Sequence, residues 1–288
     1  MQIEIRKALQ AIGDQSGMKS IKRVAGGDIN EAYYVETAER EYFIKGNKGI
    51  LSHFFQIEAT GLDYIRNSNS ISVPEVYYVD EPAEKETGVI AMEWITGQTT
   101  EKTVTDLGHN LAQMHKHTNE RHGFKEDTFI GTLPQPNGYF DDWLSYYRKQ
   151  RLQPQFSLAM EQGRMTGKRK AKMDKLLERL DQWIPANAPA SLLHGDLWGG
   201  NWMAGPADKA YLIDPSVFFG DRCFEIAFTE LFSGFPNRFY QAYEEVYPLP
   251  ENYQDIKPLY QLYYLLVHLN LFGEGYGSAV DRVLAKYV

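Results

Sequence analysis

The stretch that decides the fold of this 288-residue chain reads Leu192-Leu193-His194-Gly195-Asp196-Leu197-Trp198-Gly199-Gly200-Asn201. A second acid-bearing turn, Ile213-Asp214-Pro215, follows at the end of a short apolar run. Three acceptor side chains carry the pattern: Asp196, Asn201 five residues later, and Asp214 a further thirteen residues on. His-Gly-Asp and Asp-Pro also occur in plain turns, but turns alone do not predict three acceptors at this spacing.

These residue types at this spacing predict phosphoryl transfer from ATP. The offset from Asp196 to Asn201 equals the Asp-to-Asn offset of the kinase catalytic loop. In such a site one carboxylate, here Asp196, orients the attacking hydroxyl. An amide oxygen and a second carboxylate, here Asn201 and Asp214, hold Mg²⁺ on the phosphates. We therefore predict Asp196 as the catalytic base, Asn201 and Asp214 as metal ligands, and ATP and Mg²⁺ as cofactors.

The composition is that of an ordinary soluble globular protein, with 43% hydrophobic and 24% charged residues. A formal net charge of −8 argues against nucleic acid or an anionic membrane as the main partner. The single cysteine, Cys223, rules out an intramolecular disulfide and a cysteine metal cluster. The first residues lack the apolar core of a signal peptide, and no apolar stretch is long enough to span a bilayer. We expect a cytoplasmic protein.

In the first third of the chain, the sequence pattern predicts strands and one main helix. Gly26 and Gly27 form a turn between two strands, which can place backbone N–H groups over phosphates but also fits a plain hairpin. Lys45 ends the third predicted strand, where a kinase places its phosphate-binding lysine. Glu58 lies in the middle of a helix predicted for 52–66, capped by Ser52. We predict that Glu58 forms an ion pair with Lys45.

Two more strands are predicted at 73–79 and 88–95. The second contains Met92-Glu93-Trp94-Ile95, which we interpret as a hinge whose backbone pairs with the adenine edge. That interpretation rests on order along the chain, because the side chains say little. Beyond the hinge the pattern is helical, with helices predicted near 104–117, 140–150, 258–272 and 278–286, and another opening at Lys168.

Four stretches carry a family resemblance: residues 131–137, 146–155, 193–202 and 213–225. The most specific parts are Leu-Trp-Gly-Gly-Asn at 197–201 and Phe-Phe-Gly-Asp-Arg at 218–222, which are not general kinase features. The chain resembles the fructosamine-3-kinase (ketosamine kinase) family, in the aminoglycoside-phosphotransferase branch of the protein-kinase-like fold. The resemblance covers essentially the whole chain.

The resemblance implies an α+β, two-lobed protein-kinase-like fold. The expected lobes are 1–95, with an antiparallel sheet and one main helix, and 96–288, which is larger and mostly helical. Such kinases phosphorylate the 3-hydroxyl of ketosamines, free or on protein lysines. The 3-phosphate is unstable and leaves with the sugar, so the resemblance implies deglycation. The expected partners are therefore ketosamines or glycated protein lysines.

Three further residues are candidates for substrate contact. Trp198 is placed to stack on the sugar, although packing beneath the catalytic loop is an alternative use of the ring. Gln135 and Asn137 are weaker candidates, because amides are common in loops anyway. Some relatives carry a cysteine in the glycine-rich turn that links a redox-sensitive dimer, whereas this turn has Asp28-Ile29-Asn30. We expect a monomer with no disulfide-linked dimer.

Other classes of function share parts of this pattern. A kinase for another small alcohol, such as an aminoglycoside, choline or homoserine, would use the same site, but the stretches at 151–155 and 197–201 favour ketosamines. A protein kinase is disfavoured, because the chain between Asp214 and Cys223 is too short for an activation segment. A nucleotide-binding scaffold without catalysis would usually lose a base or a metal ligand, and none is missing here.

Overall fold

The computed structural model describes residues 1–24, 30–83, 86–232 and 234–288. The chain forms two compact units, one of residues 1–107 with 201–216 and the other of residues 108–200 with 217–288. The first unit is therefore discontinuous in sequence, whereas the predicted lobes divide once, at residue 95. The predicted phosphate-binding glycines, Gly26 and Gly27, lie outside the described residues.

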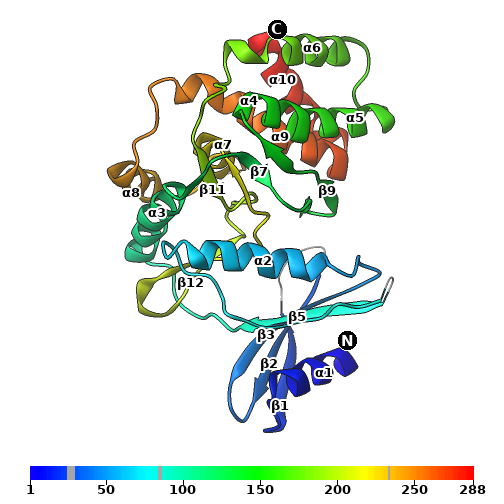
Figure 1. Ribbon diagram of the computed structural model, residues 1–288, viewed down its shortest axis with the longest axis vertical. Helices are drawn as coiled ribbons and strands as arrows, with labels where there is room; N and C mark the ends of the chain where they lie inside the picture. Colours follow the sequence, from blue (N-terminus) through cyan, green and yellow to red (C-terminus); the bar gives the residue numbers. More distant parts are fainter. Residues whose placement is uncertain (25–29, 84–85, 233) are drawn as a thin grey trace. The chain divides into compact units, whose positions relative to one another are not determined.

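The first unit contains a five-stranded antiparallel sheet of order β1-β2-β3-β5-β4, which lies between helices α1 (Gln2–Ile12) and α2 (Phe54–Asn67) (Figure 1). Its strands are β1 (Met18–Val24), β2 (Glu31–Thr37), β3 (Glu41–Lys48), β4 (Val76–Val79) and β5 (Thr87–Glu93). Lys45 lies inside β3, paired with Ala32 on one side and Ile90 on the other. The strand thus continues past Lys45, which was predicted to end it, and neighbours on both sides fix the direction of the lysine.

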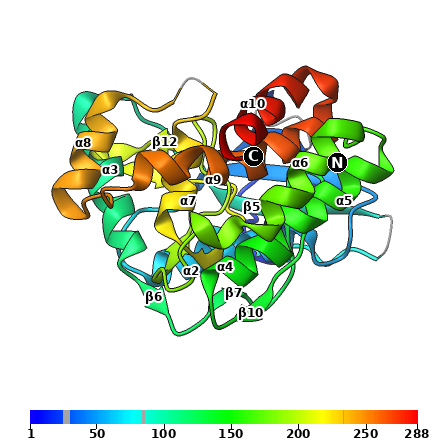
Figure 2. The same ribbon diagram turned by 90° about the horizontal axis from the view of Figure 1, so that it is seen from above.

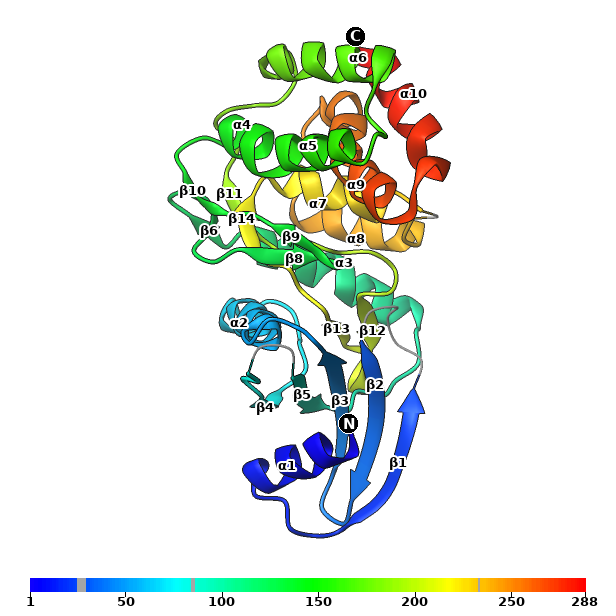
Figure 3. The same ribbon diagram turned by 90° about the vertical axis from the view of Figure 1, so that its right-hand side faces the viewer.

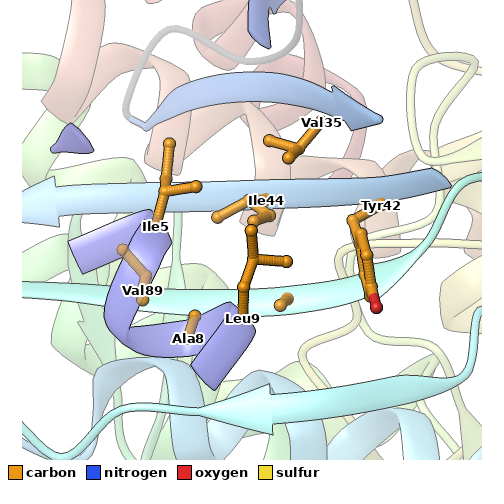
Figure 4. Close-up of a cluster of buried hydrophobic side chains, with 8 residues drawn as sticks. Ile5, Ala8, Leu9, Val35, Tyr42, Ile44 and Val89 are labelled. Carbon is orange, nitrogen blue, oxygen red and sulfur yellow. The ribbon is translucent and has the colours of Figure 1, made fainter. Parts of the chain in front are cut away.

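Helices cover the two faces of this sheet (Figure 1, Figure 3). Helix α1 (Gln2–Ile12) ends at Gly13, whose φ of 87° is left-handed and favours glycine. It buries an apolar cluster against one face (Figure 4), formed by Ile5, Ala8, Leu9, Val35, Tyr42, Ile44, Val89 and Ala91. Successive side chains of a strand point to opposite faces. Lys45, next to Ile44, therefore faces away from α1 and toward helix α2 (Phe54–Asn67).

The start of α2 differs from the prediction. The helix begins at Phe54, and the residue before it, His53, makes no side-chain capping hydrogen bond. Ser52, the predicted cap, lies in a turn closed by the Phe54 N–H, which donates to the Leu51 carbonyl at 3.0 Å. Because the helix starts later, Glu58 lies in its second turn and not in its middle.

A short hairpin completes the first unit. Strand β12 (Trp202–Ala204) pairs with β13 (Ala210–Leu212), and a bridge joins Ser72 to Tyr211. The carboxylate of Asp106, on helix α3 (Glu101–His115), accepts the Ala210 N–H at 2.8 Å. The hairpin therefore belongs to the first unit, although it follows the His194-Gly195-Asp196 stretch by only a few residues.

The second unit is mostly helical around a small sheet of order β10-β7-β14-β11-β6. Its strands are β6 (Thr118–Asn119), β7 (His122–Phe124), β10 (Gly138–Phe140), β11 (Ala190–Leu193) and β14 (Phe218–Gly220), with a separate pair of β8 (Thr128–Ile130) and β9 (Leu133–Gln135). Strands of two to four residues are too short to show an alternating pattern, which is why the sequence did not predict them.

The helices of this unit are α4 (Trp143–Tyr146), the π-helical Tyr147–Leu152, α5 (Gln153–Glu161), α6 (Gly167–Glu178), α7 (Arg222–Thr229), α8 (Asn237–Val246), α9 (Tyr253–Phe272) and α10 (Gly277–Tyr287). Helix α9 packs against α5, α7 and α10 (Figure 2). It begins at Tyr253, five residues before the predicted start at residue 258. In the described part of the chain, no helix has both the length and the apolarity needed to cross a membrane.

Candidate active site

Lys45, Glu58 and Asp214 form an ion-paired group in the first unit. Lys45 Nζ lies 2.8 Å from Glu58 Oε1 and also pairs with Asp214 Oδ1. The three residues come from β3, from α2 and from the end of the β12–β13 hairpin. Lys45 is almost fully buried. A buried ammonium group is costly unless acids neutralise it, and here two carboxylates do so. The ion pair predicted between Lys45 and Glu58 is present in the structure.

Asn201 and Asp214 lie at the same end of the hairpin. The Ile213 N–H donates to the Asn201 carbonyl at 3.0 Å, which closes the hairpin next to Asp214. Asp214 has a left-handed backbone with φ 57°, which is uncommon for any residue other than glycine and is tolerated best by Asp and Asn. Such strain is often kept at functional sites. An amide and a carboxylate are therefore held together in a fixed backbone arrangement.

The donor set at this hairpin end fits magnesium. Mg²⁺ prefers oxygen ligands and usually takes one or two carboxylates from the protein, with water and substrate phosphates completing its shell. Asn201 and Asp214 supply one amide and one carboxylate. No group of three or more His, Cys, Asp or Glu residues arranged to hold a metal occurs within residues 1–24, 30–83, 86–232 and 234–288. The arrangement fits an ion that arrives with phosphates better than a self-sufficient metal centre.

The predicted hinge, Met92 to Ile95, straddles the end of β5. Met92 pairs with Phe43 on one side and Val76 on the other. The Glu93 N–H donates to the Glu75 carbonyl at 2.8 Å, so this group is not available to an adenine. Trp94 and Ile95 follow the strand. Of the four predicted residues, these two lie beyond the strand, and their contact with the adenine stays a prediction.

Asp196 lies in the second unit, on the loop that follows β11. Its N–H donates to His194 Nδ1 at 3.3 Å. The preceding Gly195 has φ 86°, a left-handed conformation that explains why glycine stands before the acid. The turn in the sequence His-Gly-Asp is thus a fixed feature of the backbone.

A buried carboxylate, Glu225 of α7, holds this loop. Glu225 Oε1 accepts the Gly195 N–H at 2.6 Å, and Oε2 accepts the His194 N–H at 3.2 Å. The same Oε2 lies 2.9 Å from His115 Nε2. From the other side, the hydroxyl of Tyr264 donates to the Gly195 carbonyl at 3.2 Å. Both peptide groups of Gly195 are therefore fixed by side chains of the helical core.

The protonation states in this network follow from its geometry. Burial alone raises the pKa of Glu225, but hydrogen bonds, chiefly that from His115, outweigh burial and hold the pKa below its usual value. An ionised Glu225 only accepts, so His115 Nε2 donates to it. In a neutral ring, Nδ1 then accepts from the Tyr243 hydroxyl 2.7 Å away. Sequence reasoning assigned no role to Glu225. The available signal was an acid inside the apolar run Phe224-Glu225-Ile226-Ala227.

We predict that Glu225→Gln lowers the free energy of unfolding by about 2–4 kcal/mol and kcat by about ten-fold or more. An amide cannot accept three hydrogen bonds without turning its NH₂ group toward a donor, so buried groups lose their partner. The loop that carries Asp196 then shifts, and small misplacements of a catalytic group are costly. A chemical melt and steady-state kinetics measure both effects.

Glu245→Gln is the matched control. Glu245 also accepts hydrogen bonds from a histidine and an arginine of the second unit, but it is exposed. Its substitution should change both quantities little. An unchanged kcat in Glu225→Gln would show that Glu225 does not position the loop that carries Asp196.

Trp198 is 49% exposed, so it is not a core residue beneath the loop. Its ring lies against Gly200, where an added Cβ would come within 2.3 Å of Trp198 Cη2. The corresponding position at Gly199 has nothing within 4 Å. Glycine at 200 thus leaves the space that the partly exposed indole occupies.

Gln135 and Asn137, the weaker substrate candidates, lie inside the second unit. Gln135 donates to Thr128 Oγ1 at 2.9 Å and accepts from the Tyr263 hydroxyl at 2.6 Å. Asn137 Oδ1 accepts from the Tyr146 hydroxyl at 2.6 Å and from Arg151 Nη2 at 3.0 Å. Both amides are buried and engaged with the protein. Their position argues against direct substrate contact and indicates a role in packing around Arg151.

Comparisons with known proteins identify the family. A sequence profile described as fructosamine kinase matches residues 1–288. The chain belongs to the fructosamine kinase family. A probable ketoamine kinase of Enterococcus faecium is 38% identical, over 92% of this chain and 94% of that protein. A probable ketoamine kinase of Escherichia coli strain K12 is 32% identical, over 90% and 91%. The family predicted from the sequence is confirmed.

Solved structures of the fructosamine kinase family agree in fold. The structure assigned to a fructosamine-3-kinase of Haemophilus somnus 129PT superimposes with a TM-score of 0.87 at 28% identity, covering 100% of this chain and 98% of that chain. One from Thermobifida fusca gives 0.85 at 31% identity, covering 97% and 96%. The aminoglycoside phosphotransferase APH(4)-Ia gives 0.64 at 16% identity over the full length of both chains, which shows a shared fold. The predicted α+β, protein-kinase-like fold is confirmed.

Cys223 of this fructosamine kinase family member is a free thiol buried at the start of α7. Burial raises the pKa of the Cys223 thiol well above its usual range, and the thiol rather than the reactive thiolate is then present at neutral pH. The turn at 25–29, to which the expected lack of a redox-linked dimer refers, lies outside the described residues. That expectation stays a prediction.

Proposed function

We propose that this protein transfers the γ-phosphoryl group of ATP to the 3-hydroxyl of ketosamines, either free or on protein lysines. The observation that carries the proposal is the Lys45–Glu58–Asp214 group with Asn201 at the same hairpin end. Membership of the fructosamine kinase family supplies the class of acceptor. Loss of the unstable 3-phosphate with the sugar would free the amine, so the reaction would serve deglycation.

The first unit would bind the nucleotide. Lys45 has three N–H donors, so it can contact a phosphate oxygen while it keeps Glu58 as its partner. Asn201 and Asp214 would hold Mg²⁺, and Trp94 and Ile95 would contact the adenine through their backbone. Bound Mg²⁺ would neutralise phosphate charge and orient the transferred group. Phosphoryl transfer depends mainly on such positioning and charge neutralisation, which is what these residues offer.

The second unit would supply the base. Asp196 would accept the hydrogen bond of the sugar hydroxyl, orient its oxygen toward the γ-phosphorus and take the proton late in a loose transition state. The fixed peptide groups of Gly195 would hold the carboxylate in place through Glu225 and Tyr264. Trp198, two residues further on, would stack on the sugar with its exposed face.

We predict that Trp198→Ala lowers kcat/KM for ribulosyl-lysine at least ten-fold and kcat/KM for ATP much less. A stacked ring is worth about 1 kcal/mol beyond its buried area, and burial of the sugar adds to this. Part of the loss should appear in kcat, because the ring also selects the hydroxyl that meets Asp196. Because the ring is half exposed, the melting temperature should change little.

Two glycine variants provide a matched pair for this prediction. Gly200→Ala would place a methyl group against the indole and displace it, whereas Gly199→Ala meets nothing within 4 Å. Gly200→Ala should therefore reproduce the loss toward ribulosyl-lysine, and Gly199→Ala should not. Equal losses toward both substrates, together with a lower melting temperature in Trp198→Ala, would assign the ring to packing.

The substrate class can be tested with an acceptor panel. ATP turnover is measured with fructosyl-lysine, ribulosyl-lysine, choline, homoserine and an aminoglycoside at equal concentrations. The proposal predicts turnover with the two ketosamines at least a hundred-fold faster than with the other alcohols. Faster turnover with any of those three would favour the alternative small-alcohol kinase.

A further inference from the structure

Two helices of the second unit carry aromatic rings at four-residue intervals. Residues four apart lie on the same face of a helix. One series runs along α7 and just past its end, and the other along α9; they are Phe224, Phe228 and Phe232, and Tyr264, His268 and Phe272. These six residues are called the aromatic seam below.

The rings of the aromatic seam contact one another in succession. Phe228 and Tyr264 are stacked with ring centroids 3.5 Å apart and an interplanar angle of 2°. Phe228 lies 6.5 Å from Phe232, and Phe232 lies 4.4 Å from His268. His268 in turn lies 5.5 Å from Phe272. The seam is therefore continuous from its buried part to its outer end.

The inner end of the seam contacts the catalytic loop, because the Tyr264 hydroxyl donates to the carbonyl of Gly195, next to Asp196. The outer end is at the surface, where Phe232 is 45% and Phe272 63% exposed. Tyr276 joins this end, with its ring 5.1 Å from that of His268. Phe232, His268, Phe272 and Tyr276 are called the aromatic patch. Grouped, exposed apolar side chains of this kind often mark binding surfaces.

The aromatic patch is held in a defined conformation. Phe232 has φ 53°, which is strained for a bulky residue, and yet its ring remains partly in solvent. The turn Glu274–Tyr276 is fixed by Arg169, which lies 2.6 Å from Glu274 and 2.8 Å from Asp281. Burial lowers the pKa of His268, so the ring is neutral at pH 7 and the patch carries no charge of its own.

The length of the seam matches the length of a glycated lysine. From Tyr264 to Phe272 the helix rises about 12 Å, at about 1.5 Å per residue. From the 3-hydroxyl oxygen of a ketosamine to the Cα of the lysine that carries it there are nine bonds, which span about 11 Å when extended. A peptide whose sugar is at Asp196 therefore has its backbone about as far from the loop as the patch is.

We propose that the aromatic patch is the subsite for the carrier of the ketosamine, and that it binds an aromatic or large aliphatic side chain next to the glycated lysine of a peptide or an unfolded protein segment. This inference rests on the proposed function, since it assumes that the sugar is presented on a lysine. A neutral, aromatic, preformed surface suits an apolar side chain and has no charged group of its own to attract an acidic one.

The experiment compares two glycated peptides, one with the modified lysine between phenylalanines and the other with it between glycines. Free fructosyl-lysine serves as the reference acceptor. The variant is Phe272→Ser, whose exposed ring contributes little to folding, and the control is Ile3→Ser, an equally exposed apolar residue (67%) of the first unit. Both kcat/KM and direct binding of fluorescent peptides with a non-hydrolysable ATP analogue are measured.

Wild-type protein and Ile3→Ser should favour the phenylalanine peptide over the glycine peptide by about five- to ten-fold, as expected for one or two aromatic contacts. Phe272→Ser should lose that preference and keep kcat/KM for fructosyl-lysine within two-fold. Equal affinity of the wild type for the two peptides, or an unchanged preference in Phe272→Ser, would overturn the inference whatever the turnover. If free fructosyl-lysine is phosphorylated but neither peptide is bound, the inference falls alone. If free fructosyl-lysine is not phosphorylated either, the proposed function falls and the inference falls with it.

Discussion

Asp196→Ala is expected to lower kcat for ketosamine phosphorylation by about 10³-fold while ATP affinity stays within a few-fold of wild type. Acid–base catalysis by a positioned carboxylate contributes about 10²–10⁴-fold, and the residue also orients the acceptor. Asp196 belongs to the second unit, whereas the nucleotide-binding residues proposed here belong to the first. Its loss should therefore affect the chemical step and not the binding of ATP.

Single-turnover kinetics and calorimetry with an ATP analogue separate these two effects. Asp141→Ala, which removes an almost fully exposed acid of the same unit, is the control and should behave as wild type. Turnover of Asp196→Ala within ten-fold of wild type would show that another group serves as the base.

Asp214→Asn is expected to lower kcat/KM for Mg–ATP by at least about 10²-fold and to abolish the Mg²⁺ dependence of ADP binding. Asp214 is the carboxylate of the proposed metal site, and Mg²⁺ uses few protein carboxylates, so the loss of one is severe. ADP affinity is measured by calorimetry with Mg²⁺ and with a chelator, for wild type and variant.

Glu58→Gln provides the comparison for this prediction. This substitution removes the ion pair between Glu58 and Lys45, whose charged atoms lie 2.8 Å apart, but leaves the proposed metal ligands in place. This variant should lose activity and keep the Mg²⁺ dependence of ADP binding. If Mg²⁺ strengthens ADP binding equally in Asp214→Asn and wild type, Asp214 is not a metal ligand.

The nucleotide half of the site could be predicted because its chemistry is carried by residue type and order. The pattern can be recognised from the sequence alone: Lys45 lies in a strand, Glu58 in the next helix and Asp214 after a strand. The first residue of helix α2 could not be predicted in the same way. The helix begins after the turn at Leu51, and Ser52 does not cap it. The existence of a helix is therefore easier to predict than the residue at which it begins.

The support of the catalytic loop could not be predicted from the sequence. Glu225 reads as an ordinary helical acid until its contacts with His194 and Gly195, about thirty residues earlier, are known. Gln135 was predicted as a substrate contact because the sequence does not show whether an amide in a loop is buried. In the structure it is buried. A polar side chain shows its type in the sequence, but the partner that gives it a role comes from the fold.

The most direct test of the proposed function identifies the phosphorylated atom. Purified protein is incubated with Mg–ATP and ribulosyl-lysine, and the product is followed by phosphorus–proton correlated NMR. The proposed reaction should give a new phosphomonoester signal coupled to the proton on C3 of the sugar. This signal should then decay to inorganic phosphate as free lysine appears. A stable phosphate coupled to another sugar proton, or no new ester while ATP remains intact, would contradict it.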